Sequence, residues 1–180
     1  VFNGDGARLR ARGNIASLIY GTNDAYVNKY TSTEKYCYYR MFYNCTSLIK
    51  APELPATTLA DSCYYGMFHG CTSLTQAPKL PATTLASSCY LYMFTSCTSL
   101  TQAPELPATT LVNGCYDYMF YYCRKLNYVK CLATNASATD YTYYWLDNVA
   151  STGNFYTPAS TNWKTGISGI PSGWTRHDIT

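Results

Sequence analysis

Residues 63–74 read CYYGMFHGCTSL, and similar phrases stand at 37–48 (CYYRMFYNCTSL), 89–100 (CYLYMFTSCTSL) and 115–126 (CYDYMFYYCRKL). Counted from the first cysteine, offsets 0, +1, +4, +5 and +8 are Cys, Tyr, Met, Phe and Cys in all four phrases. Offsets +2, +3, +6 and +7 vary from phrase to phrase. The two halves of the phrase are therefore under different constraints.

The phrase belongs to a repeat of 26 residues, because the cysteines at 37, 63, 89 and 115 are equally spaced. Segments 63–88 and 89–114 share 18 of 26 positions. The period falls in the ~20–29 residue range of leucine-rich repeats. The constant offsets follow the rhythm of one helix face, so we expect a buried constant half and a solvent-facing variable half. The expected helices are 36–44, 62–70, 88–96, 114–122 and 140–148.

Each cycle also contains an alternating apolar segment closed by prolines, such as TSLTQAPKLP at 72–81. The alternation predicts a short strand, and proline cannot donate ladder hydrogen bonds, so the strand should be three or four residues long. The expected strands are 48–51, 74–77, 100–103 and 126–129. One such unit cannot bury its own apolar face, whereas stacked units can. The sequence predicts an α/β, right-handed, leucine-rich-repeat-like solenoid, with short parallel strands on one face and short helices on the other.

Both ends of the chain depart from the repeat and are expected to cap one continuous solenoid domain. Residues 1–36 form the expected N-terminal cap, with a hairpin turn at Asp5-Gly6 followed by a strand. Residues 37–140 hold the four repeats. Residues 141–180 hold a final helix and a C-terminal cap, whose expected apolar plugs are Phe155, Trp163, Ile170 and Trp174.

The nine cysteines suggest structural thiols. No C-x-x-C pair supports a zinc site. On a helix, offsets 0 and +8 would lie about 12 Å apart, too far for a disulfide. We therefore expect eight small buried thiols in two columns. Cys131 stands at the outward offset of Glu53, Lys79 and Glu105, so it is the thiol expected to be exposed.

Three phrases resemble a known family: MFxxCTSLTxAPELPATTL, GNIASLIYG at 13–21 and GIPSGWT at 169–175. They are similar to the BspA-like leucine-rich repeat surface proteins of host-associated anaerobic bacteria, and the resemblance covers nearly the whole chain. It implies an extracellular or cell-surface solenoid, with adhesion to host proteins or other bacteria as the activity of some members.

Composition excludes several other classes. The net charge of +3 and the absence of basic runs argue against nucleic acid as a partner. No apolar stretch approaches the ~20 residues of a membrane span. A signal peptide is not recognisable, and because the sequence starts at Val1 we expect a processed or excised piece. No cofactor or metal is expected, and we expect a monomer.

The sequence contains no catalytic motif, so we expect a protein that is not an enzyme. His69 stands at a variable offset, which favours a surface side chain over a base. The alternation Glu53, Lys79, Glu105 favours charge pairing between strands over a paired-carboxylate hydrolase. A strongly raised carboxylate pKa inside a deep pocket would favour the hydrolase instead.

The variable offsets remain as the candidate functional surface. Their sixteen positions are Tyr39, Arg40, Tyr43, Asn44, Tyr65, Gly66, His69, Gly70, Leu91, Tyr92, Thr95, Ser96, Asp117, Tyr118, Tyr121 and Tyr122. Tyrosine with Ser, Asn and Gly is also the composition of antibody paratopes. The sequence thus predicts a non-enzymatic adhesion or recognition module that binds a protein or glycan, and the alternative is a structural spacer on a cell or particle surface. The expected contact residues are Tyr39, Arg40, Tyr43, Tyr65, His69, Tyr92, Asp117, Tyr118, Tyr121 and Tyr122.

The same sixteen positions contain no Lys, Glu, Gln, Met or Trp. Those are the residues that cannot be reached from an Asn codon by changing its adenines alone. Adenine-directed mutagenesis by a diversity-generating retroelement would leave this pattern. Drift among repeats with a preference for tyrosine is the alternative.

Overall fold

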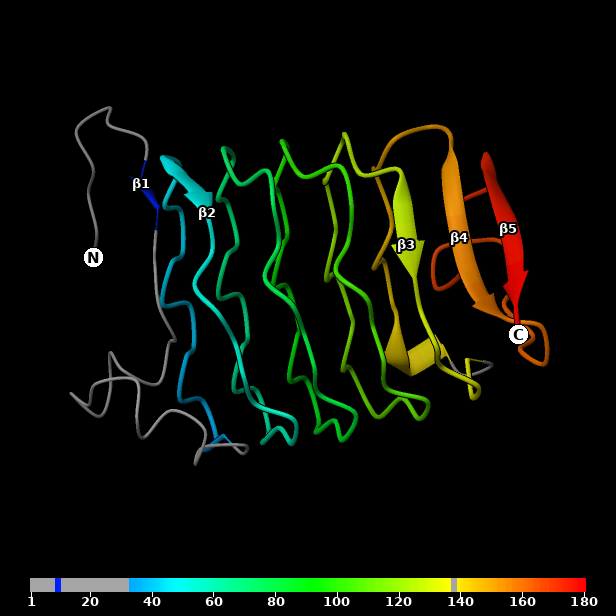
Figure 1. Cartoon of the computed structure of the whole chain (residues 1–180), viewed down its shortest axis with the longest axis horizontal. Helices are drawn as coiled ribbons and strands as arrows, with labels where there is room; N and C mark the ends of the chain where they lie inside the picture. Colours follow the sequence, from blue (N-terminus) through cyan, green and yellow to red (C-terminus); the bar gives the residue numbers. More distant parts are fainter. Residues whose placement is uncertain (1–8, 11–32, 137–138) are drawn as a thin grey trace.

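The computed structural model describes residues 9–10, 33–136 and 139–180. Along the chain these contain β1 (Leu9–Arg10), β2 (Leu48–Lys50), β3 (Tyr128–Lys130), the 3₁₀ helix η2 (Thr139–Tyr141), β4 (Gly153–Pro158) and β5 (Trp174–Ile179). Strands β1 and β2 form one sheet and β3, β4 and β5 another, and every pair is parallel. Between the two sheets, successive segments of the chain lie side by side (Figure 1). The expected Asp5-Gly6 turn and most of the expected cap at 1–36 lie outside the described residues.

The strands are shorter than expected in the middle of the chain. β2 and β3 lie at or next to the expected ranges 48–51 and 126–129. The ranges 74–77 and 100–103 contain only single bridges, Lys50 to Gln76 and Gln102 to Tyr128. Pro78 and Pro104 follow at once, and proline has no N–H to extend the ladder. The result is an open set of short parallel strands.

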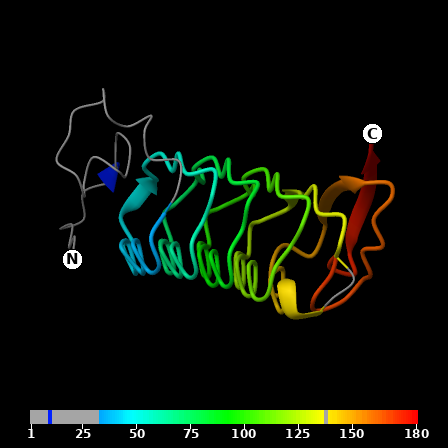
Figure 2. The ribbon, with the colours of Figure 1, turned by 90° about the horizontal axis from the view of Figure 1, so that it is seen from below.

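The five expected helices are wrong, and with them the α/β class: in the part of the chain that the structure describes, the only helical segment is η2. The constant phrases instead form series of consecutive turns, which we call ribbons 1 to 5 (35–44, 61–70, 87–96, 113–122 and 143–148). Figure 2 shows the ribbons side by side along one edge of the molecule.

Alternate amides in a ribbon have different partners. In ribbon 3, the N–H groups of Leu91, Met93 and Thr95 donate to the carbonyl three residues earlier, at 3.0–3.2 Å. The N–H groups of Tyr92 and Phe94 donate to Asp117 and Met119 of the next ribbon, at 3.1 and 2.9 Å. An α-helix would satisfy these amides within itself. A ribbon needs a neighbour to satisfy half of its donors.

This backbone requires a positive φ at every fourth residue, which gives alternate turns the signature of type II. In ribbon 2 these residues are Ser62, Gly66 and Gly70, with φ of 53°, 55° and 73°. Glycine adopts this conformation without steric cost, and both glycines weaken a helix. The phrase therefore favours turns at the positions where a helix would need good helix formers.

The predicted inward positions are confirmed. Tyr64, Met67, Phe68, Cys63 and Cys71 are all at most 1% exposed, and ribbons 3 and 4 repeat this burial. Their rings stack from ribbon to ribbon: the Phe centroids of ribbons 1 to 4 are 5.5–5.6 Å apart. The constant half of the phrase is the core of the molecule.

The cysteines are free thiols, and the two expected columns are buried except for half-buried Cys37. The Sγ–H groups of Cys71, Cys97 and Cys123 donate to carbonyls of the preceding ribbon at 3.0–3.2 Å. The helical spacing used to exclude disulfides does not apply, because the phrase is a ribbon.

Cys131 is fully buried, so its expected exposure is wrong. The bridge from Leu106 leads to Cys131, 25 residues on instead of 26. One residue fewer in this cycle shifts the register, and a shift of one residue moves a side chain to the other face of a strand. Cys131 therefore takes the inward place of Leu106.

The expected apolar plugs at the C-terminal end are all buried: Phe155, Trp163, Ile170 and Trp174 are 0–8% exposed. The ring of Trp163 stacks on Trp145 at 5.1 Å, which extends the inward tyrosine row. Strands β4 and β5, not expected from the sequence, pair over six residues each and lie at this end of the molecule (Figure 1).

Candidate recognition face

The variable offsets point away from the core and lie on adjacent ribbons. Ribbon 5 continues the register, because Tyr118 N–H and Tyr122 N–H donate to the carbonyls of Tyr143 and Asp147 at 2.8 and 3.0 Å. We call the full set of twenty outward positions the variable face. It consists of the sixteen positions of ribbons 1 to 4 named above together with Tyr143, Tyr144, Asp147 and Asn148.

A row of tyrosines runs along the variable face across all five ribbons. Tyr39 stacks on Tyr65 at 4.9 Å, Tyr65 meets Tyr92 at 5.6 Å, and Tyr92 stacks on Tyr118 at 4.8 Å. Tyr118 stacks in turn on Tyr144 at 5.4 Å. The rings touch because adjacent ribbons are joined by sideways backbone hydrogen bonds. Five variable positions thereby make one continuous aromatic surface.

The N-terminal end of this row is cationic. The Arg40 guanidinium lies 4.9 Å from the Tyr43 ring centroid and 5.4 and 5.7 Å from those of Tyr39 and Tyr65. The His69 ring lies 4.9 Å from that of Tyr43. Burial, and secondarily the Arg40 charge, lower the pKa of His69. His69 is therefore neutral at pH 7.

Two further predicted residues, Tyr121 and Tyr122, pack edge-on to the row. The ring of Tyr121 meets those of Tyr118 and Tyr122 in T-shaped contacts at 5.5 and 4.6 Å. The Arg124 guanidinium lies 5.4 Å from the Tyr122 ring centroid. The structure thus brings together all ten predicted contact residues on one side of the ribbons, with Asp117 at the C-terminal end.

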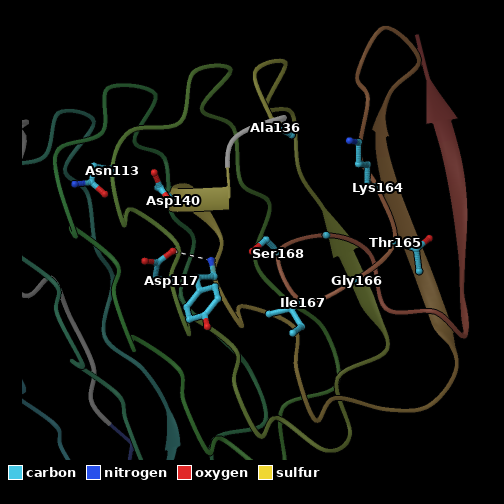
Figure 3. A pocket seen from close by; sticks show the side chains of 11 residues that line it. Asn113, Asp117, Ala136, Asp140, Lys164, Thr165, Gly166, Ile167 and Ser168 are labelled. Atoms are coloured by element: carbon cyan, nitrogen blue, oxygen red, sulfur yellow. Dashed lines mark hydrogen bonds between the residues drawn. The ribbon is translucent and has the colours of Figure 1, made fainter.

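Asp117 lies where the variable face meets a cavity of about 910 Å³. One carboxylate oxygen of Asp117 accepts a hydrogen bond from the Tyr143 N–H at 2.7 Å. Figure 3 shows Asp117 and Asp140 on one side of the cavity and Lys164 and Thr165 on the other. Burial, and secondarily the Asp140 charge, raise the pKa of Asp117. The cavity adds an acidic recess to the end of the aromatic row.

The sequence analysis missed three members of this surface: Tyr36, Tyr143 and Tyr144. Tyr36 is 52% exposed and meets the Tyr39 ring edge-on at 6.1 Å. Tyr143 is 43% exposed, and its ring meets that of Tyr144 at 4.5 Å. The register count that placed Tyr141 one cycle after Cys115 also places Tyr143 and Tyr144 at variable offsets, so the signal was present.

The sheet side is chemically different from the variable face. Lys130 Nζ lies 3.0 Å from Glu105 Oε2, so Glu105 pairs with the next cycle instead of with Lys79. Within the described ranges, no three His, Cys, Asp or Glu side chains gather as metal ligands would. No helix among the same residues has the length and apolar character needed to cross a membrane.

Comparison with known proteins adds no relative: no family model, no curated protein and no solved structure matches the chain.

Proposed function

We propose that this protein is a non-enzymatic recognition or adhesion module that binds its partner through the variable face. It would be displayed outside the cell as a right-handed, leucine-rich-repeat-like solenoid of the BspA-like kind, with turn ribbons in place of helices. The observation that carries the proposal is the unbroken tyrosine row across five ribbons.

The chemistry of the row supports binding. Tyrosine offers a broad amphipathic contact with few rotatable bonds, so little side-chain entropy is lost on association. Stacking immobilises these rings before a partner arrives, which reduces that loss further. Contiguous exposed aromatic surface of this kind marks interaction sites on soluble proteins.

Ring orientation favours a protein over a glycan as the partner. The Tyr92, Tyr118 and Tyr144 rings lie nearly parallel, with interplanar angles of 24° and 14°. Their faces are thus occupied by one another, and ring edges and hydroxyl groups remain for a partner. A sugar that stacks on an aromatic ring needs a free ring face, whereas a protein surface can use edges and hydroxyls.

The test is the triple variant Tyr92→Ser, Tyr118→Ser and Tyr122→Ser, compared with the native chain on a protein and glycan array. Ser96 already occupies the same backbone conformation as Tyr122, so the variant should fold. Loss of binding by about 100-fold or more is expected if these rings are hot spots. The matched control replaces Lys50, Gln76 and Gln102 on the sheet side by Ser and should bind normally. Equal binding by both variants would favour the structural spacer.

A second candidate is a hydrolase that uses the acidic cavity, favoured by the raised pKa of Asp117 beside Asp140. A carboxyl group kept protonated near neutral pH can act as a general acid. Turnover of chromogenic glycosides or esters that disappears in Asp117→Asn would establish this function. No turnover by the native chain would leave the recognition proposal alone.

A further inference from the structure

The fold does not depend on the side chains of the variable face. At these positions the ribbon is held by main-chain bonds: Tyr92 N–H to Asp117 O at 3.1 Å, and Ser96 N–H to Tyr121 O at 2.7 Å. Ribbons 2 and 3 show the consequence. Gly66 and Tyr92 occupy equivalent places with φ of 55° and 58°, so very different residues share one backbone.

Ribbon 5 extends the restriction in residue type. Its outward residues Tyr143, Tyr144, Asp147 and Asn148 contributed nothing to the pattern seen in ribbons 1 to 4. They too include no Lys, Glu, Gln, Met or Trp. Exposed residues of the sheet side, among them Lys50 and Glu105, do not obey the restriction. The restriction therefore follows this face and not exposure in general.

We propose that the variable face is a diversified specificity surface. Its side chains are exchanged between gene copies by replacement of adenines in Asn codons, while the ribbons and the core stay constant. This inference rests on the proposed function, because exchange at this face changes specificity only if the face binds. The partner class is a protein surface, reached by ring edges and hydroxyl groups.

The backbone limits which residues can be exchanged. Offsets +3 and +7 have positive φ in every ribbon, for example 58° at Tyr92 and 60° at Ser96. Bulky β-branched residues rarely adopt this conformation, and none of these positions carries one. Ribbons are also coupled at offset +7, because a Cβ at Gly70 would overlap the Asn44 side chain. Leu91 and Thr95, at offsets +2 and +6, have no positive φ and should accept β-branched residues.

The first experiment randomises Leu91, Tyr92, Thr95 and Ser96 of the full chain with the codon NNY, which encodes the reachable residue types only. Its matched control randomises the inward residues of the same ribbon, Cys89, Tyr90, Met93 and Phe94. Clones displayed on yeast are sorted for protease resistance. We expect at least about tenfold more folded clones from the outward library, with Val, Ile and Thr depleted at 92 and 96 but not at 91 and 95. Equal folded fractions in the two libraries would overturn the proposal.

The second experiment sequences the gene and its near-identical copies. We expect differences to concentrate at the twenty outward codons, each ending in a pyrimidine, with an adenine-rich template copy nearby. Differences spread evenly along the gene, or purine endings at these codons, would refute diversification. Neither result bears on whether Tyr92, Tyr118 and Tyr122 bind a partner, so this inference and the proposed function fail separately.

Discussion

At the scale of single residues, the ribbons depend on a conformation that most residues avoid. Eleven non-glycine residues have positive φ, all between 49° and 61°, in the part of the chain that the structure describes. For an L-residue this left-handed region costs about 1–2 kcal/mol. The sideways hydrogen bonds and the stacked rings of neighbouring ribbons have to offset that cost. The strained positions include Tyr92, Tyr118 and Tyr122 of the variable face, and backbone strain of this kind gathers at functional sites.

The cost can be measured at Ser88, which has φ of 54° and occupies the place that Gly114 holds one repeat later. Ser88→Gly removes the strained Cβ but adds freedom to the unfolded chain. We expect a net stabilisation of about 0.5–1 kcal/mol by urea denaturation. Ser87→Gly is the control: Ser87 has no positive φ, and its hydroxyl donates to the Asn113 carbonyl at 3.3 Å, so this change should destabilise. A destabilised Ser88→Gly would show that the strain is offset locally.

At the scale of the element, the sequence predicted the inward positions correctly for a reason that did not depend on the helix. A spacing of four residues puts offsets 0, +4 and +8 on one side of a helix and also of a ribbon with two alternating turns. Periodicity alone could not separate the two. Gly66, Gly70 and Asn44 could have, because they disfavour a helix and tolerate positive φ. The absence of Lys, Glu and Gln from the outward face was a second such signal.

The position of Cys131 needed more than periodicity. Its offset in a strict 26-residue count matches Glu53 and Glu105, which point outward. The bridge from Leu106 shows that the cycle is shortened by one residue, and no residue type in the segment marks where the register shifts. The variable face was predictable because it requires only that the repeats stack. The touching rings that make it continuous required the sideways hydrogen bonds.

The inward register makes a prediction for the ribbon as a unit. Phe94 is fully buried and stacks on Phe68 and Phe120 at 5.6 and 5.5 Å. Phe94→Ala should destabilise by about 3–5 kcal/mol, because it removes the ring and leaves a cavity. Leu91→Ala, at an outward position of the same ribbon, should cost about 1 kcal/mol or less. Chemical denaturation of both variants measures the difference, and similar losses would contradict the assignment of faces.

At the scale of the whole molecule, stability depends on contact between neighbouring ribbons. Half of the amide donors of a ribbon are satisfied only by the next one, and the thiol, phenol and phenyl groups stack in rows through the core. No disulfide joins the nine cysteines, so the rows are held by burial alone. Buried thiols and phenols must stay protonated, since a charge would lack solvation there.

This dependence predicts that the fold fails in alkaline solution. Burial raises the pKa of the Cys63, Cys71 and Cys123 thiols from the ordinary 9.0 to about 12. Between these values the unfolded chain has released protons that the folded chain still holds. Stability is therefore complete below pH 9 and falls as the pH rises toward 12, by about 1.4 kcal/mol per pH unit for each such thiol.

Several buried thiols acting together should exceed the roughly 5–15 kcal/mol that holds a typical domain, so we expect unfolding between about pH 10 and 11. Circular dichroism during urea denaturation at pH 7, 8.5 and 10 measures the decline. Cys123→Ala is the matched variant: it should be less stable at pH 7, because a packed group is lost, but its stability should fall less steeply above pH 9. The same steepness in both chains would show that the thiols do not cause the alkaline loss. A urea midpoint unchanged from pH 7 to pH 10 would show that the two columns are not buried in solution.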